Sequence, residues 1–290
     1  MDKKLKLAVI GKPIGHSKSP EIHQHFANQF DAKIEFRKDE VTSETLEKWL
    51  ADFFKDGGKG VSITLPLKEA ALNYADEISE RARFASACNV IYEKDEKLFA
   101  DCTDGFGLIK DLEENLKVSL KDKKILILGA GGAARGIIPS IIEKKPMKLK
   151  IANRTESKAF LLKEDLEGKV HLKEKNLIFE AGGLTDDFLL ADSYDLIINS
   201  TSVSAQSGES LMLPKALFNG INLAYDLFYS AEKTLFMKES LENGVEKVSD
   251  GWGMLVEQGA ESFRLWTNLI PDTSRSVSYT HLTLPTIYSV

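Results

Sequence analysis

Short apolar runs recur along the first hundred residues and predict buried β-strands. Leu5–Ile10 is apolar except for Lys6 and ends at Gly11, with Pro13 close behind. Glu35–Val41 is expected to be a second strand and Gly60–Thr64 a third, and Pro66 follows soon after the third. Glycine and proline interrupt strands, so these runs predict three strands with loops at their ends.

The segments between these strands predict helices. Ile22 and Phe26 recur at helical spacing within 20–30, and Ser43 is a candidate N-cap for a helix that reaches about residue 54. A further helix is expected over 68–74, and a polar turn separates the apolar stretches 89–92 and 98–100 as in a hairpin. Alternating strands and helices predict an α/β fold with a mostly parallel sheet covered by helices.

A second series of strands begins after the charged stretch 111–124. Strands are expected over 125–128, 148–152, 194–200 and 223–228, with a helix over 133–144 after the first of them. This pattern predicts a second α/β domain over 103–237, and a further helix is expected over 251–266. The last segment, 273–290, is rich in serine and threonine, and we expect it to be a tail outside the fold, either non-native or disordered.

Composition narrows the class of protein. The 290 residues carry a formal net charge of -6, whereas nucleic-acid binding needs a basic face, so no nucleic-acid partner is expected. No apolar run is long enough to cross a membrane, and two cysteines do not make a disulfide framework. We therefore expect a cytoplasmic protein. No metal site is expected, because His16, His23 and His25 lack acidic or cysteine partners nearby.

A glycine-rich turn after the 125–128 strand predicts a dinucleotide site. The turn opens a helix and has the GxGxxG/A arrangement, in which backbone approaches a pyrophosphate at a helix N-terminus. The candidate cofactor residues here are Gly129, Ala130, Gly131, Gly132 and Ala133. A plain tight turn is the alternative interpretation.

The end of the next strand favours NADP over NAD. Asn153, Arg154 and Thr155 stand where an NAD site would place an acidic residue for the ribose hydroxyls. Arg154 can instead pair with a 2′-phosphate. The alternative is a solvent-facing arginine beside a helix N-cap at Thr155.

Motifs in order along the chain complete the candidate site. Ser17 and Ser19 lie in the turn after the first strand and are either carboxylate ligands or two helix-start serines.

Over about residues 5–270 the sequence resembles the shikimate dehydrogenase family, in the segments 13–20, 62–68, 89, 101–105, 129–135, 153–155, 199–202, 226–229 and 251–258. The resemblance implies NADPH-dependent, reversible reduction of 3-dehydroshikimate to shikimate, a step of the shikimate pathway to chorismate and the aromatic amino acids. It also implies that the C-terminal helix returns to the first domain, so that 1–102 plus 238–272 form the substrate domain.

The resemblance also implies residue roles. Lys68 and Asp104 are the expected catalytic pair, since a lysine can stabilise and protonate the alkoxide that a hydride leaves on a ketone. The expected substrate ligands are Ser17, Ser19, Thr64, Lys68, Asn89, Asp104, Tyr229 and Gln258. The further expected cofactor residues are Thr201, Ser202, Gly251 and Met254. From residue types alone, a solvated helix-start lysine at Lys68 and a helix N-cap at Asp104 are the favoured interpretations.

The sequence departs from the family pattern at several positions. Ser62 and Cys102 replace asparagines, and Ser204-Ala205 replaces a Gly-Met pair. These departures keep two alternatives open: a quinate/shikimate dehydrogenase that uses NAD, or a non-catalytic dinucleotide-binding regulator. The oligomeric state is left as monomer or homodimer.

Overall fold

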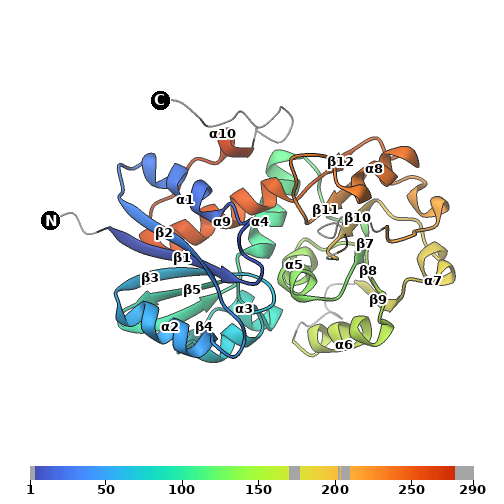
Figure 1. Ribbon diagram of the computed structural model, residues 1–290. Coiled ribbons are helices and arrows are strands. Elements are labelled where there is room, and N and C mark those ends of the chain that lie inside the picture. The colour runs from blue at the N-terminus through green and yellow to red at the C-terminus, as the bar shows by residue number, and fades with distance from the viewer. Residues whose placement is uncertain (1–3, 170–176, 202, 204–209, 278–290) are drawn as a thin grey trace. The chain divides into compact units, whose positions relative to one another are not determined.

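The computed structural model describes residues 4–169, 177–201, 203 and 210–277 (Figure 1). Contacts divide the chain into two compact units. The first contains Met1–Lys110, Arg135–Ser140 and Leu255–Thr273, and the second contains Asp111–Ala134, Ile141–Met254 and Ser274–Val290. Both units are α/β, as the alternating pattern predicts.

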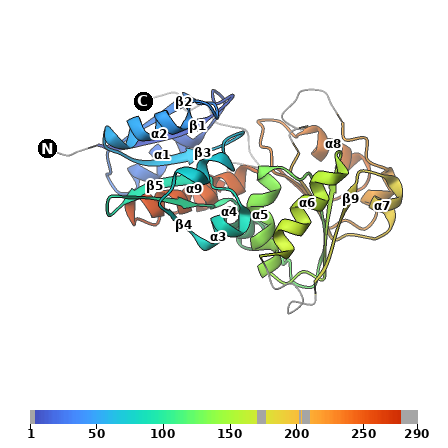
Figure 2. The same cartoon turned by 90° about the horizontal axis from the view of Figure 1, so that it is seen from below.

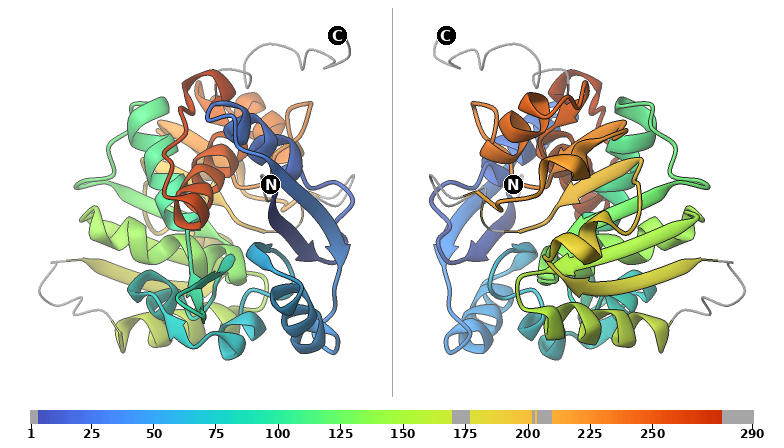
Figure 3. Two further views of the ribbon diagram at one scale, coloured as in Figure 1. Left: turned by 90° about the vertical axis from the view of Figure 1, so that its left-hand side faces the viewer. Right: turned by 90° about the vertical axis from the view of Figure 1, so that its right-hand side faces the viewer.

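The first unit is built on a six-stranded sheet in the order β2-β1-β3-β5-β6-β4. Strand β1 pairs in parallel with β2 and β3, and the left-hand view of Figure 3 shows the blue strands β1 and β2 side by side. The predicted hairpin is confirmed, because β5 and β6 pair antiparallel from Val90↔Asp101 to Lys94↔Lys97. The strands are β1 (Leu5–Gly11), β2 (Ile34–Glu40), β3 (Gly58–Ile63), β4 (Glu77–Ile78), β5 (Val90–Lys94) and β6 (Lys97–Asp101).

Helices cover both faces of this sheet (Figure 1). The helical segments of this unit are α1 (Ser19–Asn28), α2 (Leu46–Lys55), the 3₁₀ helix η1 (Ala70–Tyr74), α3 (Glu80–Ala85), α4 (Asp104–Lys110) and α9 (Trp252–Thr267). The proposed cap at Ser43 is wrong: Thr45 is the N-cap residue of α2. The expected 68–74 helix is shorter and of 3₁₀ type, so Lys68 lies in the preceding loop.

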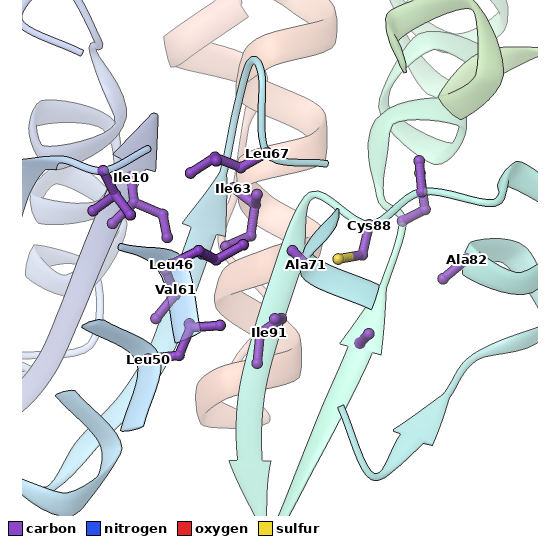
Figure 4. Close-up of a cluster of buried hydrophobic side chains, with 14 of the residues drawn as sticks. Ile10, Leu46, Leu50, Val61, Ile63, Leu67, Ala71, Ala82, Cys88 and Ile91 are labelled. Carbon is purple, nitrogen blue, oxygen red and sulfur yellow. The ribbon is translucent and has the colours of Figure 1, made fainter. Parts of the chain in front are cut away.

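Side-chain alternation in the first sheet assigns each helix to a face. Ala8, Ile10, Val61 and Ile63 point to the same cluster as the buried α2 residues, and Figure 4 shows this cluster together with Leu67, Ala71, Cys88 and Ile91. On the other face, Trp266 of α9 lies against Gly60, where an added Cβ would overlap the indole ring. Only a residue without a side chain allows α9 to pack this closely on β3.

The second unit has a fully parallel six-stranded sheet in the order β12-β11-β10-β7-β8-β9. Strands in such a sheet are buried on both faces, which explains the unbroken apolar runs at β7 and β10. The strands are β7 (Lys124–Leu128), β8 (Lys148–Asn153), β9 (Ile178–Gly183), β10 (Leu196–Asn199), β11 (Leu223–Asp226) and β12 (Val248–Ser249). The sequence pattern did not predict the two edge strands β9 and β12, which are partly polar or very short.

Helices cover both faces of the second sheet (Figure 2). Residues of α7 and α8 join a core with β7, β10 and β11, whereas α6 packs on β8 and β9 from the other face. The helical segments are the π-helix η2 (Asp111–Asn115), α5 (Gly132–Glu143), α6 (Glu156–Glu167), α7 (Asp186–Leu190), the 3₁₀ helix η5 (Lys215–Phe218), α8 (Leu235–Glu242) and α10 (Ser274–Val277). No helix in the described ranges is long and apolar enough to span a bilayer.

Two boundaries differ from those expected from the sequence. Residues 238–254 lie with the second unit, because β12 pairs with β11, whereas the sequence suggested a return to the first domain from residue 238. The start of the expected tail is also tied to the fold. Thr273 is buried and donates a hydrogen bond to Glu257 (2.8 Å), and Trp252 donates to the carbonyl of Ser276. Residues 278–290 lie outside the described part of the chain.

Candidate active site

Lys68 and Asp104 form a buried ion pair in the first unit. The Lys68 ammonium donates to Asp104 Oδ2, and their side chains are 13% and 7% exposed. Burial alone lowers the pKa of Lys68, but the charge and hydrogen bond of Asp104 raise it by more, so the pKa of Lys68 lies above its ordinary value. The lysine is therefore charged and buried at neutral pH rather than a solvated surface group.

Backbone hydrogen bonds hold the loop that carries Lys68. The amide of Leu67 donates to the carbonyl of Thr64 (3.0 Å), and Leu67 itself is fully buried in the core. The carbonyl of Lys68 accepts from the amide of Cys88 (2.8 Å). The lysine is thus fixed on both sides of its Cα, which limits the conformations from which its ammonium group reaches Asp104.

Each oxygen of the Asp104 carboxylate has a partner. Oδ2 accepts from Lys68, and Oδ1 accepts from Nδ2 of Asn89 (2.9 Å). Gly136 of α5 lies beside the carboxylate, since an added Cβ would be 2.7 Å from Oδ2. Asp104 is the first residue of α4, but its side chain serves the lysine and the asparagine, which favours the catalytic interpretation over a simple N-cap.

Asn89 and Gln258 meet in a hydrogen-bonded cluster that also contains Thr103 and Ser262. Asn89 Nδ2 donates to Gln258 Oε1 (3.0 Å), and Thr103 Oγ1 lies 3.2 Å from Ser262 Oγ. Sequence reasoning singled out Asn89 and Gln258 but missed Thr103 and Ser262. Thr103 stands next to Asp104 in the matched 101–105 segment, which was the one available indication of its importance.

Ser17, Ser19 and Thr64 lie on two loops that are joined by a backbone hydrogen bond. The amide of Lys12 donates to the carbonyl of Leu65 (3.0 Å). Ser17 Oγ accepts from the amide of Ser19 (3.3 Å), and the two serine hydroxyls are 3.2 Å apart in a buried turn. Ser19 begins α1, so its place fits both interpretations of this pair, the helix-start serine and the anion ligand.

The glycine-rich turn has the geometry expected of a pyrophosphate site. Gly129 has a φ of +110°, and an added Cβ there would be 2.6 Å from Ser200 Oγ, so glycine is required. Gly131 is the N-cap residue of α5, and an added Cβ there would meet nothing within 4 Å. A dinucleotide phosphate fits this arrangement, in which Gly129 is closely packed, Gly131 is open and the twelve-residue helix α5 follows.

Asn153, Arg154 and Thr155 follow β8, with Arg154 and Thr155 exposed. Asn153 Nδ2 donates to the carbonyl of Thr155 (2.8 Å), which fixes the turn. Thr155 is the N-cap residue of α6, but its side chain makes no cap hydrogen bond within the described residues. The side chains of Arg154 and Thr155 are therefore accessible to solvent at the end of β8.

The remaining candidates of the second unit lie on loops after β10 and β11 and at the start of α9. Thr201 donates to Asn199 Oδ1 (2.7 Å), and Tyr229 packs against Phe228 and Trp252. Gly251 is tight against the chain, since an added Cβ would overlap the carbonyl of Leu227, and Met254 is buried. Ser202 and the departure at 204–205 lie outside the described residues.

The two cysteines near Lys68 are not reactive thiolates. Burial raises the pKa of Cys88 to about 12 and also raises the pKa of Cys102 well above its ordinary value. Cys102 Sγ lies 3.8 Å from the carbonyl of Gly136. The residue that replaces the family's asparagine therefore fills a buried contact beside α5.

Comparisons with known proteins agree with this geometry. The family model described as the shikimate dehydrogenase substrate binding domain matches residues 9–91. The model for shikimate / quinate 5-dehydrogenase matches residues 111–207, and the one for the shikimate 5'-dehydrogenase C-terminal domain matches 251–275. A protein of Herminiimonas arsenicoxydans named shikimate dehydrogenase (NADP(+)) is 41% identical over 93% of this chain and 94% of its own length. A protein of the same name from Colwellia psychrerythraea is 42% identical over 91% of this chain and 92% of its own length.

Solved structures show the same architecture. An Ael1 enzyme from Pseudomonas putida aligns with a TM-score of 0.85 and 36% identity, covering 97% of this chain and 99% of that chain. A shikimate 5-dehydrogenase from Thermus thermophilus, in complex with NADP(H) and shikimate, aligns with a TM-score of 0.81 and 31% identity, covering 95% and 98% of the two chains. With identity above 40% over nearly all of its length, the chain belongs to the shikimate dehydrogenase family.

Proposed function

We propose that this protein catalyses the reversible, NADPH-dependent reduction of 3-dehydroshikimate to shikimate. The observation that carries the proposal is the buried Lys68–Asp104 pair within a chain that matches the family over almost its full length. The reaction would place the protein in the shikimate pathway, which leads to chorismate and the aromatic amino acids.

Lys68 is proposed to supply the proton of the reaction. NADPH, when bound, supplies a hydride, which converts the ketone carbon into an alcohol carbon bearing a negatively charged oxygen. The Lys68 ammonium is charged in the resting protein because its pKa is raised. It stabilises that oxygen and then gives it a proton, and in the reverse direction the neutral amine takes the proton back.

Asp104 is proposed to orient Lys68 and to bind a substrate hydroxyl. Its Oδ2 holds the ammonium, and the lone pairs that remain on the carboxylate can accept from a hydroxyl. Thr64, Asn89, Tyr229 and Gln258 are proposed to bind further hydroxyls, and Ser17 and Ser19 the carboxylate. Polar groups matched to several hydroxyls favour a polyol acid, because an analogue without one hydroxyl leaves a buried group unpaired.

NADP is the proposed cofactor, held by two separate parts of the second unit. The turn Gly129–Ala133 would take the pyrophosphate at the start of α5. Asn153, Arg154 and Thr155 would take the 2′-phosphate, for which the exposed guanidinium supplies paired donors. Thr201, Ser202, Gly251 and Met254 are proposed to lie on the nicotinamide side.

The protein is proposed to act in the cytoplasm, as a monomer or homodimer, on a small-molecule substrate and without a nucleic-acid or membrane partner. The first unit is proposed to bind the substrate and the second unit to bind NADP. A quinate/shikimate dehydrogenase that uses NAD remains the second candidate, and the family model for shikimate / quinate 5-dehydrogenase favours keeping it.

The test is NADPH oxidation with 3-dehydroshikimate, measured for the wild type, Lys68→Ala and Lys68→Met. Proton-transfer residues contribute a factor of roughly a hundred or more, so both variants are expected to lose at least that much of kcat. Quinate with NAD or NADP, in the oxidation direction, tests the second candidate. A wild type that binds NADPH but turns over neither 3-dehydroshikimate nor quinate would refute the enzyme and leave the dinucleotide-binding regulator.

A further inference from the structure

The hydroxyl group of Thr103 lies at the centre of the cluster that joins Asn89 to α9. Thr103 is fully buried, and its Oγ1 lies within hydrogen-bonding distance of three other side chains. These are Asn89 Nδ2 (2.9 Å), Gln258 Oε1 (3.3 Å) and Ser262 Oγ (3.2 Å). Its sequence neighbour is Asp104, so one residue connects the ion pair to the C-terminal helix.

Donor and acceptor capacities determine the direction of these hydrogen bonds. Asn89 Oδ1 accepts from the backbone amide of Thr103 (2.7 Å), so the Asn89 amide nitrogen must face Thr103 Oγ1, Asp104 Oδ1 and Gln258 Oε1. That nitrogen has two protons for three acceptors. The Thr103 hydroxyl is the group that can both accept one of these protons and donate its own.

The single proton of the Thr103 hydroxyl has a restricted choice of acceptors. Ser262 Oγ donates its own proton to the carbonyl of Gln258 (2.8 Å) and so faces Thr103 as an acceptor. The other acceptors in reach are Gln258 Oε1 and Asn89 Oδ1, both at 3.3 Å. Asn89 Nδ2 can only donate, and the Thr103 hydroxyl can turn its proton to Gln258 Oε1, so both groups are satisfied when Gln258 presents the oxygen of its carboxamide to them.

This arrangement fixes which end of Gln258 is free for a ligand. With Oε1 turned toward Thr103 and Asn89, Nε2 lies at the other end of the carboxamide and donates one hydrogen bond to the carbonyl of Leu255 (2.9 Å). A flipped amide would place Nε2 against Asn89 Nδ2, donor against donor. Such a contact is unfavourable in a buried cluster.

We propose that Thr103 is a positioning residue, whose hydroxyl holds the Gln258 carboxamide with its oxygen inward and presents Nε2–H to an oxygen of the substrate. The proposal rests on the proposed function, in which Gln258 binds the hydroxylated acid. Lys68 pairs directly with Asp104 Oδ2, which Thr103 Oγ1 does not contact, so a change at Thr103 is expected to affect substrate binding and to leave the Lys68–Asp104 ion pair in place.

The kinetic test compares Thr103→Val, Thr103→Ser and the matched control Thr267→Val. Valine keeps the shape of threonine without its hydroxyl, and serine keeps the hydroxyl. Thr267→Val removes a hydroxyl that donates to the carbonyl of Phe263 and accepts from the amide of Leu269, at the end of α9. Thr103→Val is expected to raise KM for 3-dehydroshikimate about tenfold, as for one lost hydrogen bond, with kcat and KM for NADPH nearly unchanged. Thr103→Ser and the control are expected to stay within about threefold of the wild type.

Unchanged KM in Thr103→Val, or an equal rise in Thr103→Ser, would overturn the proposal, since the hydroxyl would then have no separate role. A merely structural hydroxyl would lower the unfolding midpoint in Thr103→Val and in the control alike, and would leave KM for the substrate as in the wild type.

An NMR measurement separates this proposal from the proposed function. The side-chain amide protons of Gln258, assigned through Gln258→Glu, are expected to be shifted in Thr103→Val and kept in Thr103→Ser, whether or not the protein turns over 3-dehydroshikimate. In the wild type itself, the hydroxyl proton of Thr103 is expected to be protected from exchange. A rapidly exchanging hydroxyl proton, or Gln258 signals that are the same in all three proteins, would refute the positioning role even in an active enzyme.

Discussion

His23 makes the first unit sensitive to acid, and its structure gives the size of the effect. The side chain is 1% exposed and lies among the rings of Phe26, Phe36, Phe263 and Trp266, with centroid separations of 4.8–6.1 Å. Its Nδ1 has no hydrogen-bond partner among the described residues. Burial lowers the pKa of His23 from 6.5 to about 3, because the charged imidazolium would lose its hydration without a compensating partner.

The direction in which pH changes the free energy of unfolding follows from proton binding to His23 in the folded and unfolded states. Between pH 6.5 and 3 the unfolded chain carries a proton on His23 and the folded protein does not, so acid favours unfolding. The stability associated with neutral His23 is present above the unfolded pKa and is lost as the pH falls. From these two pKa values the loss is about 0.8 kcal/mol at pH 6 and about 2 kcal/mol at pH 5, relative to pH 7.5.

The assay is urea unfolding of the wild type and His23→Phe at these three pH values. The ring centroids of Trp266 and His23 are 4.8 Å apart, so the fluorescence of Trp266 responds to unfolding around His23. Phenylalanine retains an aromatic ring that cannot titrate. Carboxylates contribute the same pH dependence to both proteins, so the difference between them isolates His23. Equal losses of unfolding free energy in the two proteins between pH 7.5 and 5 would refute the reasoning.

Three further predictions concern other positions. Gly136→Ala places a Cβ 2.7 Å from the carboxylate of Asp104 and should lower kcat about tenfold or more. The control Gly168→Ala, whose Cβ would be 3.6 Å from its nearest neighbour, should leave turnover unchanged. Equal rates in the two variants would contradict the close contact at Gly136. Arg154→Ala should raise KM for NADPH about tenfold or more while KM for NADH stays the same, and a parallel change for both cofactors would exclude a 2′-phosphate contact. Tyr225→Phe removes a buried donor to Asp111 (2.7 Å) and should lower the free energy of unfolding by about 1–3 kcal/mol, which chemical denaturation measures; a stability equal to the wild type would mean that the carboxylate finds another partner.

The local sequence was sufficient to predict most elements and the cofactor turn. Strands β1, β7 and β10 are mostly apolar runs bounded by loop residues, and β5 and β6 enclose a polar turn, so neighbours along the chain carry the information. Gly129 was predicted from its motif, and its φ of +110° explains why glycine stands there. Lys68 and Asp104 were identified from a family resemblance, because by residue type alone each had an ordinary explanation.

Tertiary structure decided what depends on residues far apart in sequence. Thr103 and Gln258 are 155 positions apart, and their hydrogen bond exists only because α9 returns to the first unit. The raised pKa of Lys68 depends on Asp104, which is 36 positions away, and the lowered pKa of His23 depends on rings from β2 and α9. A sequence pattern records which side of an element is apolar, whereas the partner of a polar atom is fixed only when elements pack and exclude water.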